Sequence, residues 1–197
     1  MTTAPKMLHE AKEEFTEAVK RSKGKVVVLV HPFYLDYSPS DESWAQNAEQ
    51  RQRHREIVLK LAKAHPRVPI VVLEEEGKAQ QTHAVLSAPN SFYVNTYESN
   101  PNPVSGWKKL HRAFENSGVK TVLLGGQLAH KEHLSFLTSL YGDIKAHDAK
   151  LNRPPGSSIV RGCVAGAYNE IIEAKYAKVR LLPNLLFPDK PEFKRLK

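Results

Sequence analysis

Short, uninterrupted runs of apolar, mostly β-branched residues recur along this chain. Residues 26–30, 70–73 and 119–124 form such runs, and further strands are predicted over 92–97 and 178–182. Because the runs do not alternate apolar with polar residues, they are typical of strands covered on both faces. Strands that alternate with helices form a parallel sheet through right-handed crossovers. The sequence therefore predicts a three-layer, Rossmann-like α/β fold with a mostly parallel sheet of five or six strands.

Helical spacing of apolar residues separates these runs. Helices are predicted over residues 7–21, 43–65, 78–86, 106–116, 133–140 and 163–175. Residues 1–188 are expected to form a single domain, since 197 residues suffice for one substantial core. Residues 142–158 are polar and contain Pro154-Pro155-Gly156, which predicts a long loop or an insertion. Residues 189–197 are predicted to form a basic C-terminal tail.

The charge and the cysteine count restrict the class of protein. The formal net charge is +8 and the chain has one cysteine, which excludes an internal disulfide. No apolar run approaches the roughly 20 residues of a membrane helix, and residues 1–20 are too polar for a signal peptide. We therefore expect a cytoplasmic protein with no membrane contact. The basic surface is explained by solubility or by binding to nucleic acid, and a homo-oligomer is an open alternative.

Parallel sheets bind ligands beyond the carboxyl ends of their strands, where the strand order reverses. Here those ends are residues 31–34, 74–76, 97–99, 125–127 and 183–184. The candidate ligand-binding residues taken from them are Tyr34, Tyr97, Glu98, Gly125, Gly126 and Gln127. The two glycines are expected to form a tight turn whose amides approach a small-molecule ligand. Their spacing matches neither a dinucleotide fingerprint nor a P-loop, so no cofactor is predicted. If the first and fourth strands are neighbours, His31 and residues 125–127 flank the crevice.

Cys163 lies at the predicted N-terminus of a helix. Backbone dipoles there favour a thiolate, so Cys163 is a candidate nucleophile with a lowered pKa. The alternative is a small buried apolar residue, since Val164 and Ala165 follow it directly. His130 and His133 could share one helix face, but a solvated helix start explains them as well, and no metal is predicted.

The order of these features resembles the isochorismatase-like superfamily of cysteine hydrolases. The resemblance rests on residues 26–35, on residues 118–126 with their glycine ending, on Gly162-Cys163-Val164 with Ala167 and Tyr168, and on residues 176–182. It implies Cys163 as the nucleophile. His31 stands where that family has its aspartate base and is therefore the candidate base. The implied function is a hydrolase acting on a small amide, ester or carboxylate. The alternative is a non-catalytic basic α/β module that binds a nucleotide, RNA or a protein.

Overall fold

The computed structural model describes residues 4–37, 48–97, 101–127 and 163–186. Its strands are β1 (Lys25–Val30), β2 (Ile70–Glu75), β3 (Ser91–Thr96), β4 (Thr121–Gly126) and β5 (Lys178–Leu186). Its helices are α1 (Lys12–Arg21), α2 (Tyr34–Tyr37), α3 (Ala48–Ala64), α4 (Glu76–Leu86), α5 (Trp107–Asn116) and α8 (Cys163–Glu173).

The five strands form one parallel sheet in the order β3-β2-β1-β4-β5. The prediction that the runs 26–30, 70–73 and 119–124 pair in parallel is confirmed, because β1 lies between β2 and β4. Val30 at the end of β1 is in register with Leu73 on one side and Gly126 on the other. The three central strands therefore end close together.

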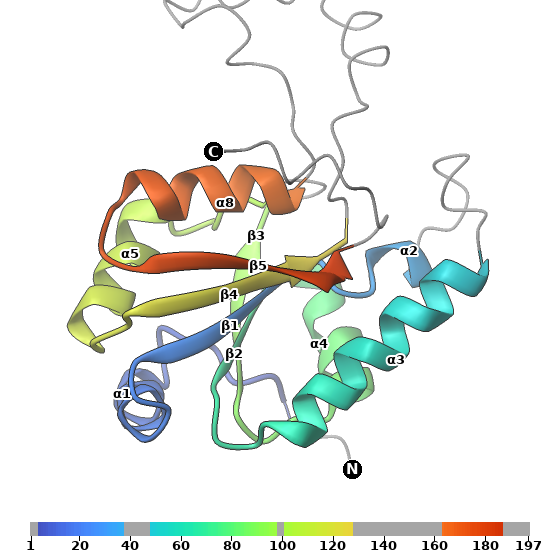
Figure 1. Ribbon diagram of the computed structural model, residues 1–197, viewed down its shortest axis with the longest axis horizontal. Helices are drawn as coiled ribbons and strands as arrows, with labels where there is room; N and C mark the ends of the chain where they lie inside the picture. The colour runs from blue at the N-terminus through green and yellow to red at the C-terminus, as the bar shows by residue number, and fades with distance from the viewer. Residues whose placement is uncertain (1–3, 38–47, 98–100, 128–162, 187–197) are drawn as a thin grey trace, which may run out of the picture.

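Helices cover both faces of the sheet, so the predicted three-layer arrangement is confirmed (Figure 1). Alternate residues of β1 separate the two cores: Val26 and Val28 face α1, α5 and α8, whereas Val27 and Leu29 face α3 and α4. On the first side, Phe15 of α1 stacks on a phenylalanine of α5 with ring centroids 5.7 Å apart. A strand buried on both sides needs apolar residues at every position, which explains the uninterrupted run in β1.

The outer edge of β3 is covered by the N-terminal segment. The backbone N–H of Leu8 donates to Tyr93 at 2.9 Å, and Tyr93 donates to the carbonyl of Lys6 at 2.8 Å. The Lys6 ammonium pairs with Glu14 and also donates to the Pro89 carbonyl at 3.3 Å. This segment satisfies backbone groups that an exposed edge strand would leave open.

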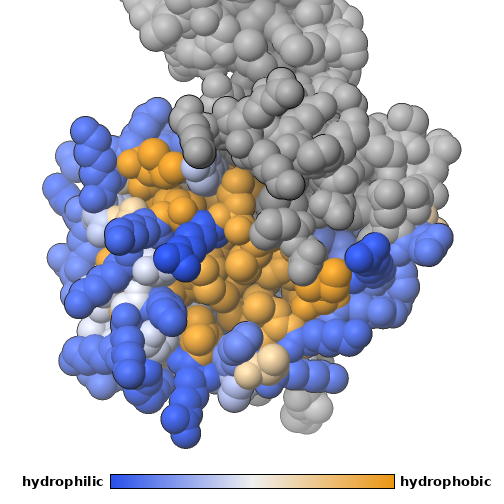
Figure 2. All heavy atoms as spheres, in the orientation of Figure 1, coloured by the Kyte–Doolittle hydropathy of each residue, from blue (hydrophilic) through white to orange (hydrophobic). Residues whose placement is uncertain are grey.

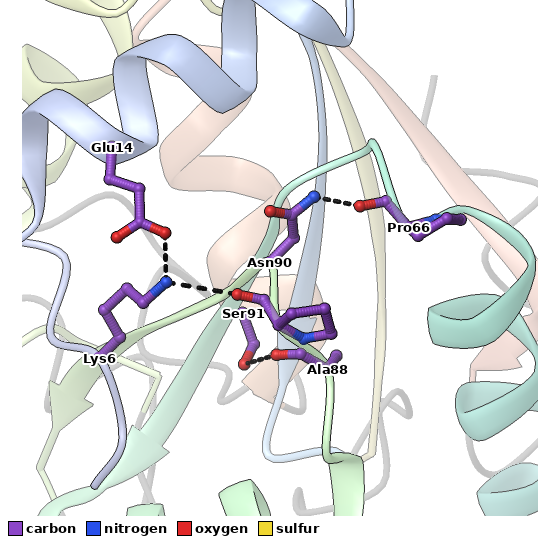
Figure 3. A network of polar contacts seen from close by, with 7 residues as sticks. Lys6, Glu14, Pro66, Ala88, Asn90 and Ser91 are labelled. Carbon is purple, nitrogen blue, oxygen red and sulfur yellow. Dashed lines mark hydrogen bonds and ion pairs between the residues drawn. The ribbon is translucent and has the colours of Figure 1, made fainter. Parts of the chain in front are cut away.

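Side chains also fix the turn that leads into β3, as Figure 3 shows. Asn90 donates to the carbonyl of Pro66 across the turn before β2, and the Ser91 hydroxyl donates to Ala88 at 2.7 Å. These contacts lie near the amino ends of the strands. The opposite end is therefore the one where the rule for parallel sheets places a ligand.

Two strands, β4 and β5, extend further toward the C-terminus than expected. β4 includes Gly125 and Gly126, so these glycines end the strand and are not a turn behind it. β5 continues to Leu186 and includes Pro183 and Asn184, which were expected to lie beyond it. Proline is tolerated there because, among the described strands, β5 lies at an edge of the sheet and pairs with β4 alone.

The edge along β5 is apolar between the helices that flank it. Figure 2 shows hydrophobic side chains on this face, with hydrophilic ones around them. The partly buried residues that contribute here include Val179, Leu181 and Leu182.

Several predicted segments fall outside the described residues. These are the helix over 133–140, the loop over 142–158, the tail over 189–197 and the beginning of the helix predicted over 43–65. The remaining predicted helices correspond to α1, α4, α5 and α8, with ends that differ by a few residues.

Candidate functional site at the carboxyl edge of the sheet

The strand order reverses between β1 and β4. The chain adds β2 and β3 on one side of β1 and then returns to place β4 and β5 on the other. His31 follows β1 and Gln127 follows β4, and both side chains are fully buried. Their backbones are locked to neighbouring strands, because His31 donates to Leu73 at 2.9 Å and Gln127 donates to Val30 at 3.0 Å. β1 and β4 are neighbours, so His31 and residues 125–127 lie together at this switch point, whereas a ligand-binding crevice between them stays a prediction.

His31 has a backbone that L-residues rarely adopt. Its φ is 44°, in the left-handed region. This conformation turns the chain from β1 toward α2, and the His31 carbonyl accepts a hydrogen bond from the Tyr34 N–H at 3.2 Å. A side chain with a Cβ costs about 1–2 kcal/mol in this region, and glycine avoids that cost. Histidine therefore stands where the backbone alone would favour glycine.

The imidazole of His31 reaches across the end of β2 to the end of β3. Its Nε2 lies 3.1 Å from the Thr96 hydroxyl. Within the described part of the chain, its Nδ1 is buried and has no hydrogen-bond partner. Burial lowers the pKa of His31 to about 4, while Glu75 acts to raise it and Lys78 to lower it. The ring is therefore neutral at neutral pH, with one nitrogen engaged and the other free.

A partly buried ion pair lies beside the His31 ring. Lys78, in the first turn of α4, contacts the carboxylate of Glu75 at 2.8 Å. The Lys78 ammonium also lies over the Tyr34 ring, 4.2 Å from its centroid, and Tyr34 lies 5.9 Å from the His31 ring. The strand β2 passes directly into α4 at Glu75, which places the acid and the base three positions apart at the sheet edge. We call His31, Tyr34, Glu75, Lys78 and Thr96 the edge cluster.

Glu74 points to the opposite face of the sheet from Glu75, because side chains alternate along a strand. Its carboxylate accepts a hydrogen bond from Thr82 of α4 at 2.8 Å and one from the backbone N–H of Glu75 at 3.1 Å. Burial raises the pKa of Glu74 to about 7, against the lowering effect of these two hydrogen bonds.

Cys163 begins α8, as predicted, but its environment differs from the expected one. Its side chain is 6% exposed and packs in the core on the α1, α5 and α8 side. Burial, together with the charges of Glu75 and Glu74, raises the pKa of Cys163 to about 12. The expectation of a lowered thiol pKa is therefore wrong, and the burial of Cys163 agrees with the alternative of a small buried residue. Desolvation and two nearby carboxylates outweigh the helix dipole, whose effect is typically 0.3–1 kcal/mol.

Close strand packing accounts for the two glycines of β4. A Cβ on Gly126, whose φ is 141°, would lie 2.1 Å from the carbonyl oxygen of Val30. A Cβ on Gly125 would lie 2.6 Å from the Cβ of Leu185 on β5. Both positions therefore need glycine for packing, whether or not a ligand approaches them. Their role in ligand binding stays a prediction.

The structure brings together only some of the predicted site residues. His31, Tyr34 and Gln127 are buried at the carboxyl edge, whereas the side chain of Tyr97 is 56% exposed on the surface. Glu98 lies outside the described residues.

The sequence candidates did not include Glu75, Lys78 or Thr96. The spacing of Glu75 and Lys78, three positions apart at a strand-to-helix junction, was a signal that could have indicated the ion pair. Thr96 carried no comparable signal, because its contact with His31 depends on the order of the strands.

The basic face of α3 is partly engaged within the protein. Arg55 pairs with Asp36 at 2.8 Å and lies over the Phe33 ring at 5.4 Å. Arg53 and Lys60 are exposed. Nucleic-acid binding by this surface stays a prediction.

The described ranges contain neither a metal centre nor a membrane-spanning helix. No group of three His, Cys, Asp or Glu side chains in residues 4–37, 48–97, 101–127 and 163–186 is arranged to hold a metal ion. No helix in those same ranges is long and apolar enough to cross a membrane. Comparisons with protein-family models, with curated proteins and with solved structures found no match to this chain.

Proposed function

We propose that this protein binds a small polar ligand at the carboxyl edge of its sheet, with Nδ1 of His31 as a contact. The observation that carries the proposal is His31 itself. A buried polar atom without a partner costs roughly 1–3 kcal/mol, and the left-handed backbone of a residue with a Cβ costs about 1–2 kcal/mol. Both costs fall on one residue at the switch point of a parallel sheet, where ligands bind. Strain of this kind is concentrated at functional sites.

The edge cluster determines what the imidazole offers to a ligand. Thr96 engages Nε2, so the direction of that hydrogen bond decides whether Nδ1 donates or accepts. The ammonium of Lys78 is already paired with Glu75. An anionic ligand would have to compete with Glu75 for this ammonium, whereas a hydroxyl, amide or carbonyl group can bind the free imidazole nitrogen without breaking the pair. A neutral polar group is therefore the best match.

A cysteine hydrolase acting on a small amide, ester or carboxylate is the second candidate. It is kept because Cys163 lies at the same edge, close enough to Glu74 and Glu75 for their charges to raise its pKa. Catalysis needs a thiolate and a base. With the thiol pKa at about 12 and the His31 pKa at about 4, both groups are neutral near pH 7. These protonation states favour binding over nucleophilic catalysis.

A ligand-observed NMR screen tests the proposal. The compounds are small alcohols, amides, esters, carboxylates and nucleotides, and each hit is then titrated by calorimetry. His31→Gly removes the ring while suiting the left-handed backbone, and we expect it to weaken a hit at least tenfold. His9→Ala, at a surface histidine, is the matched control and should leave the affinity unchanged. An absence of hits in all five classes, or equal affinity of His31→Gly, would contradict the proposal.

The same hits separate binding from hydrolysis. Each hit is incubated with the protein, and its products are followed by NMR. We expect the hits to remain unchanged. Turnover that disappears in Cys163→Ala would favour the hydrolase instead.

A further inference from the structure

Glu74 connects the central part of the sheet to α4. The side chain is fully buried, and its two carboxylate oxygens are engaged by different elements. One accepts the hydroxyl hydrogen of Thr82, two turns into α4, and the other accepts the backbone N–H of Glu75 at the end of β2. The carboxyl group is therefore the polar contact that joins the strand end to the packed face of the helix.

The surroundings of Glu74 oppose a negative charge. The packed face of α4 around it is apolar and includes Ala79 and Leu86. The charged groups of the described chain that act on it are Glu75, which raises its pKa, and Lys78, which lowers it. The nearby thiol of Cys163 is neutral and offers no compensating charge.

We propose that Glu74 is a proton-controlled latch, which holds α4 against β2 when it is uncharged and loosens that contact when it loses its proton to solvent. The cause is the cost of keeping a carboxylate out of water. The consequence reaches the edge cluster, because the same helix carries Lys78, one turn before Thr82, and Lys78 pairs with Glu75 and covers Tyr34. This inference does not depend on the identity of a ligand.

Hydrogen exchange of the α4 amides between pH 6 and pH 9 tests the latch. The pKa of Glu74 is about 7 in the closed state and 4.5 for an exposed glutamate. Opening should therefore become about tenfold more favourable from pH 6 to pH 8 and then level off to pH 9. The rates are corrected for the intrinsic pH dependence of exchange before they are compared.

Two matched variants assign the effect. Glu74→Gln keeps the shape and, like the protonated acid, one acceptor oxygen and one donor group, but it cannot ionise. Its corrected exchange should therefore be independent of pH. Glu76→Gln removes an exposed glutamate at the start of α4, two residues after Glu74, and should retain the tenfold rise. Corrected exchange that is flat in the unmodified protein, or that rises equally in Glu74→Gln, would overturn the proposal.

A second measurement needs no variant. The ¹³C shift of the Glu74 side-chain carboxyl should titrate with a midpoint near pH 7 in the unmodified protein. A midpoint below pH 5 would overturn the latch, because the carboxylate would then already be charged at pH 6.

Discussion

Substituting His31 measures the energetic cost of its left-handed backbone conformation. At φ 44° any residue with a Cβ costs about 1–2 kcal/mol more than glycine. His31→Ala and His31→Gly both lose the contact with Thr96 and leave the space of a fully buried ring. Only the glycine variant also avoids the energetic cost of the left-handed backbone. We therefore expect His31→Gly to be more stable than His31→Ala by about 1 kcal/mol.

Urea denaturation at pH 7 measures this difference as a shift in midpoint at constant slope. Gln81, exposed within α4, gives a control of opposite sign. At this position the alanine variant, Gln81→Ala, should be more stable than Gln81→Gly by about 1 kcal/mol, because glycine weakens a helix. If the alanine variant at position 31 were as stable as the glycine variant, the left-handed assignment and the functional argument built on it would both be refuted.

Three further outcomes follow from buried groups. Gly126→Ala should destabilise the protein by roughly 3 kcal/mol or more, since the new methyl would overlap the Val30 carbonyl. Gly77→Ala, in open space on α4, should instead stabilise the protein by up to about 1 kcal/mol. The urea midpoints of the two variants measure both effects. Cys163 should alkylate with iodoacetamide more slowly than a model thiol at pH 7.5, because burial keeps it protonated, and unfolding in urea should restore the normal rate. The folded state keeps the Glu74 proton up to about pH 7 and the unfolded state releases it near pH 4.5, so stability is lost as the pH rises through this window. Glu74→Gln cannot ionise and should therefore be more stable than the unmodified protein by roughly 3 kcal/mol at pH 8. At pH 4 this difference should be absent.

The fold was predictable because a strand that is buried on both faces has a recognisable sequence, an uninterrupted run of apolar residues. The runs that became β1, β2 and β4 were recognised from their uninterrupted apolar residues, and their parallel pairing follows from the helices between them. The ends of strands were less predictable. Gly125 and Gly126 had the composition of a turn, but their lack of a side chain is used for close packing against Val30 and Leu185.

The site was predictable only where it depends on strand ends. His31 and Gln127 were found because each directly follows a buried run. The contact between His31 and Thr96 depends on the crossing order of three strands, which composition does not encode. The position of Cys163 at the start of a helix was also predictable. Its burial depends on residues distant in sequence, and this burial reversed the expected pKa shift.

The most direct test of the proposed binding site is a long-range ¹H–¹⁵N NMR spectrum of the histidine rings. The free protein should show a neutral His31 ring at pH 7, as its lowered pKa requires. When a hit from the screen is added to saturation, the Nδ1 resonance of His31 should move, while the exposed rings of His9 and His65 should not. A saturating ligand that leaves both nitrogens of His31 unchanged would show that binding occurs elsewhere and would contradict the proposed site.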